Sequence, residues 1–230
     1  MISESYFWKK ELYKNYQVLA RFLHLKSYTE RSFVNAEKAV MMSAYIIRKL
    51  NEAGKIPPDF LKDSICLKEY SAAVDVIDKL NLHHIDRNYN LTQCKKHNDK
   101  REFLIDQIIH SFVFYFVLDK QSNDFAFFIN SDKTKKTSLF EISFEKFFEI
   151  ILLVSEGIIC ESHYSVDKKA HERKLTFAKY CYPKSFNIKK IIKDTFSGKI
   201  YTRRKNIEYD FPTMRKEQID KMINESITIL

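Results

Sequence analysis

The sequence predicts an α+β protein that is mainly α, with a helical bundle as its core, a β-hairpin packed on it and a basic helical C-terminal extension. Three observations support this fold class. The 230 residues include 3 glycines and 4 prolines, whereas sandwiches and barrels of many short strands need frequent turns. Hydrophobic residues make up 45% of the chain, enough for a large core. In several long segments the apolar residues recur at three- and four-residue steps, as in amphipathic helices.

Two long helices are expected at the N-terminus, over residues 5–25 and 30–53, because both segments carry an apolar stripe at helical spacing. Thr29 is the expected N-cap of the second helix. Gly54 suits the left-handed position that often follows a helix, and the two prolines that come next prevent its continuation. The first 55 residues are therefore predicted to form an antiparallel helical hairpin.

Residues 99–118 form the most apolar long segment before the middle of the chain. The segment is longer than a typical strand, so we expect the central helix of the bundle here, with Asp99 as its N-cap. The polar stretch before it predicts short strands at 64–68 and 88–94 and a short helix at 72–80.

Two β-rich runs at 125–130 and 137–142, separated by a charged linker, predict a hairpin. Ser143 and Gly157 suit the two ends of a further helix. The composition then changes, which suggests a core domain over 1–157, with its hairpin at 125–142, and a basic C-terminal subdomain over 158–230. The elements expected in that subdomain are a strand at 158–164, a basic helix at 167–180, a helix at 186–196, an extended segment at 201–209 and a final helix at 213–229.

The net charge of +9 is concentrated near the C-terminus, where residues 168–205 hold 13 Lys and Arg but 2 acidic residues. Such asymmetry favours a polyanionic partner. Nearby tyrosines can stack on bases. We therefore predict binding of RNA or DNA, or of a nucleic-acid-bound protein complex, through Lys168, Lys169, Arg173, Lys174, Arg203, Arg204 and Lys205. Two alternatives stay open: a solvated lysine-rich face, and a surface that docks onto an acidic partner protein.

Candidate catalytic residues lie in the expected central helix. Asp106 and His110 are four residues apart, so a helix would place them on one face, with Arg101 near its first turn. A carboxylate that orients an imidazole, beside an arginine that contacts phosphate, suits metal-independent phosphodiester cleavage by a ribose hydroxyl. The alternative is structural: His110 and Asp106 are hydrogen-bonded core residues, or Asp106 pairs with Arg48 and joins two helices.

The Arg101, Asp106 and His110 series in a helical domain resembles the HEPN superfamily, whose members include prokaryotic ribonucleases of defence and toxin systems. The spacing is longer than the family pattern, with eight residues between Arg101 and His110. The resemblance covers roughly residues 5–118. It implies a metal-independent ribonuclease or an inactive relative in a phage-defence or toxin–antitoxin system, with a homodimer as one form of assembly.

The cysteines Cys66, Cys94, Cys160 and Cys181 show no C-x-x-C pairing and are predicted to be reduced thiols. The histidines His83, His84 and His97 lack acidic or thiol ligands at suitable offsets, so no metal or cofactor is expected. No run approaches the roughly 20 apolar residues of a membrane span, and no signal peptide is expected.

These features predict a cytoplasmic prokaryotic protein that acts on nucleic acid, without membrane contact. The alternative is a non-enzymatic subunit that docks onto a partner protein or complex through its basic C-terminal surface. Both versions leave room for a homodimer or a hetero-complex, and whether the protein is an enzyme is left open.

Overall fold

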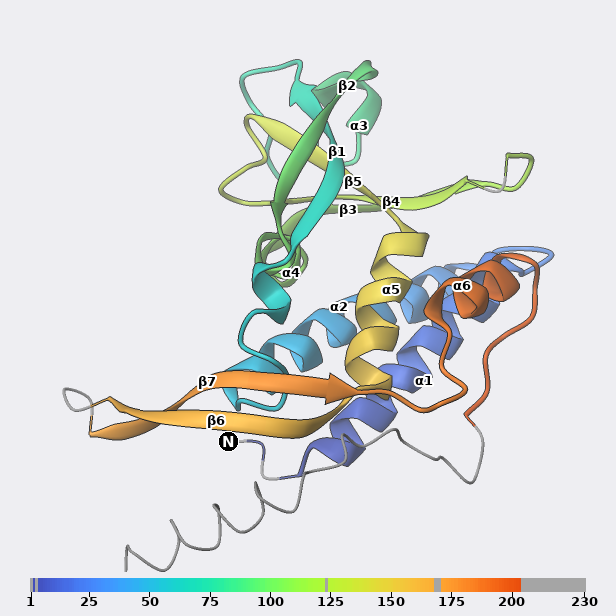
Figure 1. The fold of residues 1–230 in the computed structure, drawn as a ribbon. Coiled ribbons are helices and arrows are strands. Elements are labelled where there is room, and N and C mark those ends of the chain that lie inside the picture. The colour runs from blue at the N-terminus through green and yellow to red at the C-terminus, as the bar shows by residue number, and fades with distance from the viewer. Residues whose placement is uncertain (1, 3, 123, 168–170, 204–230) are drawn as a thin grey trace, which may run out of the picture.

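The structure is a computed structural model that describes residues 2, 4–122, 124–167 and 171–203 (Figure 1). A layer of helices lies between two β-structures (Figure 1). On one side is a five-stranded antiparallel sheet, and on the other is a two-stranded ribbon that projects away from the body. The prediction of a helical-bundle core is therefore wrong, because the helices bury their apolar side against a sheet and do not surround a central helix.

The two N-terminal helices agree with those predicted at 5–25 and 30–53. Helix α1 (Ser5–Leu23) packs against α2 (Glu30–Glu52). Thr29 is the N-cap of α2, and its hydroxyl accepts a hydrogen bond from the Ser32 N–H in a capping box. Gly54 has a φ of 63°, the left-handed conformation that the glycine was expected to supply. Helix α5 (Phe144–Glu156) completes the layer, with Ser143 and Gly157 as its caps, as predicted.

The sheet has the strand order β2-β1-β5-β4-β3, and all neighbouring strands are antiparallel. Its strands are β1 (Ser64–Ala72), β2 (Tyr89–Lys100), β3 (Ser111–Asp119), β4 (Asp124–Ser131) and β5 (Ser138–Ser143). Short elements connect them: η1 (Phe60–Lys62), α3 (Ile85–Asn88) and α4 (Arg101–Ile109). The predicted hairpin at 125–142 is confirmed as β4 and β5, and the strand predicted at 64–68 lies within β1.

Aromatic packing joins the sheet to the helices. The ring of Phe127 on β4 lies 5.4 Å from that of Phe114, 5.6 Å from Phe144 and 5.3 Å from Phe147. Phe127, Phe144 and Phe147 are all fully buried. Edge-to-face and offset contacts of this kind add to the free energy of burying the rings.

The opposite face of the sheet is stabilised by polar contacts as well. The Tyr70 hydroxyl donates to Glu141 Oε2 at 2.5 Å, and Lys68 Nζ lies 2.7 Å from Glu141 Oε1. Glu141 is buried, so these two partners compensate the loss of its hydration. The segment between β1 and β2 covers this face with a small second core that includes Ile77 and Tyr89.

The predicted central helix at 99–118 is wrong. Asp99 lies in β2, Lys100 caps α4, α4 ends at Ile109, and the chain continues as strand β3. The continuous apolar run had no period that could separate a buried helix from the strand that follows it. The helix predicted at 72–80 is also absent: β1 extends to Ala72, and irregular turns follow.

After α5 the chain forms strands β6 (Ile158–Asp167) and β7 (Glu172–Cys181) and then helix α6 (Ile188–Phe196). The strand at 158–164 and the helix at 186–196 are confirmed. The basic helix predicted at 167–180 is wrong, because its described residues from 172 onward belong to β7. Ile191 and Ile192 of α6 share the hydrophobic core with α1 and α5. The subdomain boundary at residue 157 stays a prediction, and the segments expected at 201–209 (beyond Arg203) and 213–229 lie outside the described residues.

Candidate nucleic-acid interface

Strands β6 and β7 form a long antiparallel ribbon, which we call the arm, that projects beyond the helical layer (Figure 1). Its register pairs Ile158 with Cys181 at the base and Val166 with Arg173 toward the tip. Two register shifts interrupt the ladder, between Ile159 and Glu161 and between His163 and Tyr164. Bulges of this kind increase the twist of a two-stranded ribbon.

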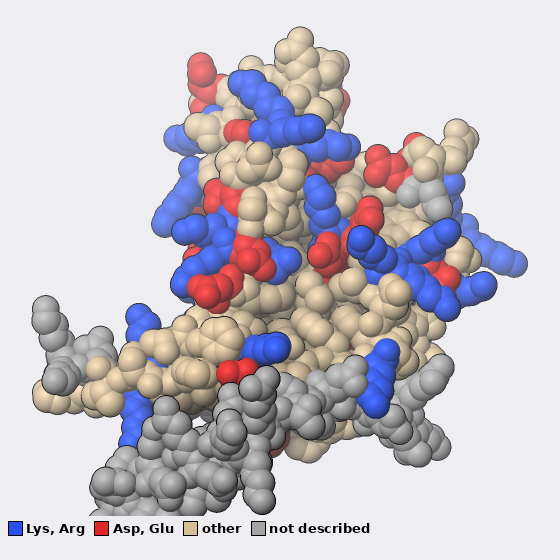
Figure 2. Space-filling model, viewed as in Figure 1, with Lys and Arg blue, Asp and Glu red and all other residues tan. Residues whose placement is uncertain are grey.

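The arm exposes aromatic and aliphatic side chains beside basic ones. Tyr164 is 59% exposed, Val166 65% and Phe177 45%. Arg173 and Lys174 are exposed on β7. A shallow hollow of about 390 Å³ is lined by Tyr164, Val166 and Arg173. Figure 2 shows the arm as a projection on which Lys and Arg side chains stand beside a largely uncharged surface. An aromatic ring next to a guanidinium can stack on a base while the cation contacts phosphate.

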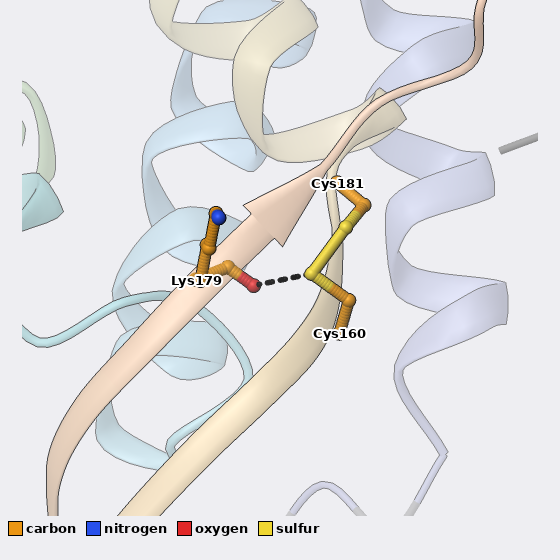
Figure 3. Close-up of a disulfide and its surroundings, with 3 residues drawn as sticks. All are labelled: Cys160, Lys179 and Cys181. Atoms are coloured by element: carbon orange, nitrogen blue, oxygen red, sulfur yellow. Dashed lines mark hydrogen bonds between the residues drawn. A yellow bond between two sulfur atoms is a disulfide. The ribbon is translucent and has the colours of Figure 1, made fainter. Parts of the chain in front are cut away.

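A disulfide between Cys160 and Cys181 closes the base of the arm, with the two Cα atoms 5.9 Å apart (Figure 3). The Sγ atom of Cys160 also lies 3.4 Å from the carbonyl oxygen of Lys179 (Figure 3). The prediction that all four cysteines are reduced is thus wrong for this pair, whereas Cys66 and Cys94 are free thiols. The two residues are 21 positions apart and become neighbours because the ribbon folds back on itself. Since an isolated hairpin is marginally stable, the cross-link helps to hold the arm.

The arm is anchored where it leaves α5. A Cβ atom on Gly157 would lie 2.8 Å from the Leu153 carbonyl oxygen and 2.8 Å from Cδ2 of Tyr180, so only glycine allows this close approach. The buried Lys9 donates to the Gly157 carbonyl oxygen at 2.6 Å, and its Nζ lies 4.9 Å from the centre of the Tyr180 ring. Burial, helped by the nearby Arg203 and Lys55, lowers the pKa of Lys9 to about 8.

Arg203, a predicted nucleic-acid contact, is an anchor of the chain and not an exposed cation. Its Nε donates to Glu156 Oε1 at 2.6 Å and its Nη2 to the Ser155 carbonyl oxygen at 2.7 Å. Its guanidinium stacks on Tyr13, 4.5 Å from the ring centre. The arginine offsets burial of Glu156, although burial still raises the pKa of that carboxyl group. Of the other predicted contacts, Lys168, Lys169, Arg204 and Lys205 lie outside the described residues.

The three candidate catalytic residues have separate surroundings. Arg101 donates to Asp63 Oδ2 at 2.8 Å and stacks on Phe60. Asp106 accepts from Arg48 Nη1 at 3.2 Å. His110 is the exposed C-cap of α4, and within the described part of the chain its side chain makes no hydrogen bond or ion pair. The structure therefore does not bring these residues together around one phosphate.

The structural alternative for Asp106 is confirmed in part. Arg48 and Asp106 form an ion pair between α2 and α4, as that alternative expected. The side chains are 39% and 50% exposed, however, so the pair is not buried and contributes little to the stability of the fold.

Three further candidate binding residues were not predicted from the sequence: Tyr164, Val166 and Phe177. The signal was the alternation of the large apolar Leu175 and Phe177 with the smaller Thr176 and Ala178, which fits a strand better than a helix. The prediction of a helix at 167–180 placed the basic residues on one helix face and gave the aromatic residues no role.

In the described ranges, no group of three or more His, Cys, Asp or Glu side chains is placed to hold a metal ion. His97 instead hydrogen-bonds to Glu69, with 3.1 Å between Nδ1 and Oε2, and packs on Phe140. None of the described helices combines the length and the apolar character needed to cross a bilayer. No protein-family model matches the chain, and neither a curated protein nor a solved structure matches it significantly.

Proposed function

We propose that the protein binds RNA or DNA and that the arm is its main contact surface. The observation that carries this proposal is the exposure of Tyr164 beside Arg173 in the hollow of a projecting ribbon that also exposes Phe177 and Lys174. A two-stranded ribbon is narrow enough to enter a nucleic-acid groove. Aromatic stacking and phosphate contacts together provide affinity with little dependence on sequence.

The proposal includes no catalytic step. Arg101 and Asp106 are engaged by Asp63 and Arg48, and among the described residues none forms a hydrogen bond with the His110 ring that would set its tautomer. Binding without cleavage is therefore the expected activity, in keeping with an inactive relative of a ribonuclease or with a nucleic-acid-binding subunit.

The test is fluorescence anisotropy with labelled single-stranded RNA, single-stranded DNA and duplex DNA over a salt series. Arg173→Glu with Lys174→Glu should weaken binding at least tenfold at low salt, and Tyr164→Ala should weaken single-strand binding by 1–3 kcal/mol, the approximate value of one stacked base. The matched control is Lys95→Glu with Lys96→Glu on β2, which makes the same change of charge on exposed lysines away from the arm. Equal losses in both charge variants would contradict a role of the arm.

A second function is favoured by the large exposure of Val166, 65%, because an aliphatic side chain next to the hollow suits a protein partner better than phosphate. In that case the arm docks onto another protein of a complex. Absence of nucleic-acid binding at low salt, together with capture of a partner that Val166→Asp abolishes, would select this function.

A further inference from the structure

Strand β3 is an edge of the sheet with an unusual composition. It pairs with β4 on one side, and none of the other described strands pairs with its outer side. Its residues from Phe112 to Leu118 include no charged residue, no proline and no glycine. Natural edge strands normally carry charged residues or proline to prevent pairing with another chain. An edge without them suits a partner strand.

The sequence of β3 is nearly palindromic about Tyr115. In an antiparallel pair of two identical strands centred on this residue, Phe114 faces Phe116 and Val113 faces Val117. Phe112 and Leu118, both large and apolar, would follow, although a register shift between Ser111 and Val113 limits the regular ladder to the central residues. Pairs of aromatic and of β-branched residues across two strands stabilise a sheet. The strand is thus complementary to a second copy of itself.

Helix α2 extends this surface on the helical side of the sheet. The ring of Phe33 lies 6.0 Å from that of Phe116, and Met41 Sδ lies 3.9 Å from Ser111 Oγ, so α2 runs beside β3. Along it, Phe33, Val34 and Met42 are 37%, 40% and 45% exposed. A two-fold axis perpendicular to the sheet keeps both helical layers on one face, which brings the two α2 helices toward each other.

We propose that the protein forms a two-fold symmetric homodimer in which the β3 strands of two copies pair antiparallel about Tyr115 and make one continuous ten-stranded sheet. Strand pairing alone covers a small area, and stable dimers bury about 1,200–2,000 Å². The exposed apolar residues of α2 supply the additional contact. The proposal is independent of the arm and of nucleic acid, since neither is needed to form this interface.

Sedimentation velocity of the full chain between roughly 1 and 100 µM, the range in which interfaces of micromolar Kd dissociate, tests the assembly. The wild type is expected to be a dimer at the upper end. Tyr115→Lys should give a monomer, because Tyr115 is 55% exposed and a lysine there leaves the monomer fold intact. Leu91→Lys, which places the same charge on the other edge strand, should leave the dimer unchanged.

The register is tested by cross-linking in a Cys94→Ser background, which removes the exposed native thiol. Tyr115→Cys should form a disulfide between copies on mild oxidation, because paired Cα atoms at the two-fold lie about 4.5–5.5 Å apart. Asp119→Cys should not, because its two Cα atoms would be about 27 Å apart at the strand rise of about 3.4 Å.

A wild type that is monomeric throughout the concentration range would overturn the proposal, as would a dimer that survives Tyr115→Lys. Should Tyr115→Lys fail to fold, as circular dichroism would reveal, Val34→Lys on α2 provides a second test. It is expected to weaken the dimer at least tenfold without touching the sheet, and an unchanged dimer would again contradict the interface.

Discussion

The two edges of the sheet are built in opposite ways. Strand β2 is exposed along most of its length and carries Lys95, Lys96 and Lys100. Strand β3 has no charge between Phe112 and Leu118, and its Phe114 and Phe116 pack against the main core. Lysines on an edge strand prevent another chain from pairing, because a charge must be desolvated before the backbones can meet. One edge of this sheet therefore carries charges that oppose strand pairing, whereas the central residues of the other edge carry none.

The largest expected effect comes from making β2 resemble β3. Lys95→Val with Lys96→Val removes the charges that protect this edge, so each copy would then have two edges that can pair. Such copies no longer close as dimers, and we expect them to form large assemblies. Static light scattering measures this increase in mass, with Lys95→Arg and Lys96→Arg as the control that keeps the charge. A valine variant of the same mass as the wild type would show that the lysines do not protect the edge.

A second prediction concerns the packing behind the two edges. Phe127 lies at the centre of the aromatic contacts on the β3 side and is fully buried, so Phe127→Ala should lower the free energy of unfolding by about 3–5 kcal/mol. Leu91 on β2 is 36% exposed, and Leu91→Ala should cost less than about 1 kcal/mol. Denaturant-induced unfolding measures both values. Similar losses of unfolding free energy in the two variants would contradict the contrast between the aromatic packing next to β3 and the exposed edge strand β2.

The smallest expected effect is a pH dependence of the unfolding free energy, which arises because Lys9 is buried whereas the lysines of β2 are exposed. The folded pKa of Lys9 is about 8, below its ordinary value of 10.5, because the side chain is buried. Between these two pH values the unfolded chain binds the proton and the folded chain does not, so the wild type gains stability as pH rises. Below pH 8 the charged amine is present in both states, and its burial costs roughly 3 kcal/mol at most.

Lys9→Met removes this titration. The difference in unfolding free energy between the variant and the wild type should therefore shift in favour of the wild type between pH 8 and pH 10.5. Lys95→Met on the exposed β2 edge serves as the control, because its difference from the wild type should not change over that interval. Unfolding midpoints measured across the interval decide between the two outcomes, and parallel curves for Lys9→Met and the wild type would refute the burial cost.

Local signals explain which parts of the fold could be predicted. The α2 caps at Thr29 and Gly54 act within a few residues, and they mark the helix correctly. The β4–β5 hairpin was visible because its strands flank a charged linker. The boundary between α4 and β3 was not visible, because both elements are apolar and joined without a glycine or proline.

The candidate sites divide in the same way. The basic residues Arg173 and Lys174 were identified from charge, which needs no knowledge of the fold. Tyr164, the aromatic neighbour of Arg173, was missed because it comes from the other strand of the arm, and only the register brings the two residues together. The group of Arg101, Asp106 and His110 looked coherent only while one helix was assumed to carry all three.

Three features follow from the sequence alone: the helices with local caps and apolar stripes, the excess of positive charge toward the C-terminus, and the uncharged palindromic composition of residues 112–118. Other features depend on the folded chain: this segment is an edge strand, Arg203 pairs with Glu156, and Cys160 forms a disulfide with Cys181. The two groups of features differ because the interactions behind them act over different separations along the chain. Capping and periodicity act within about one or two helical turns, whereas strand order and cross-strand pairs depend on contacts between residues far apart in the chain.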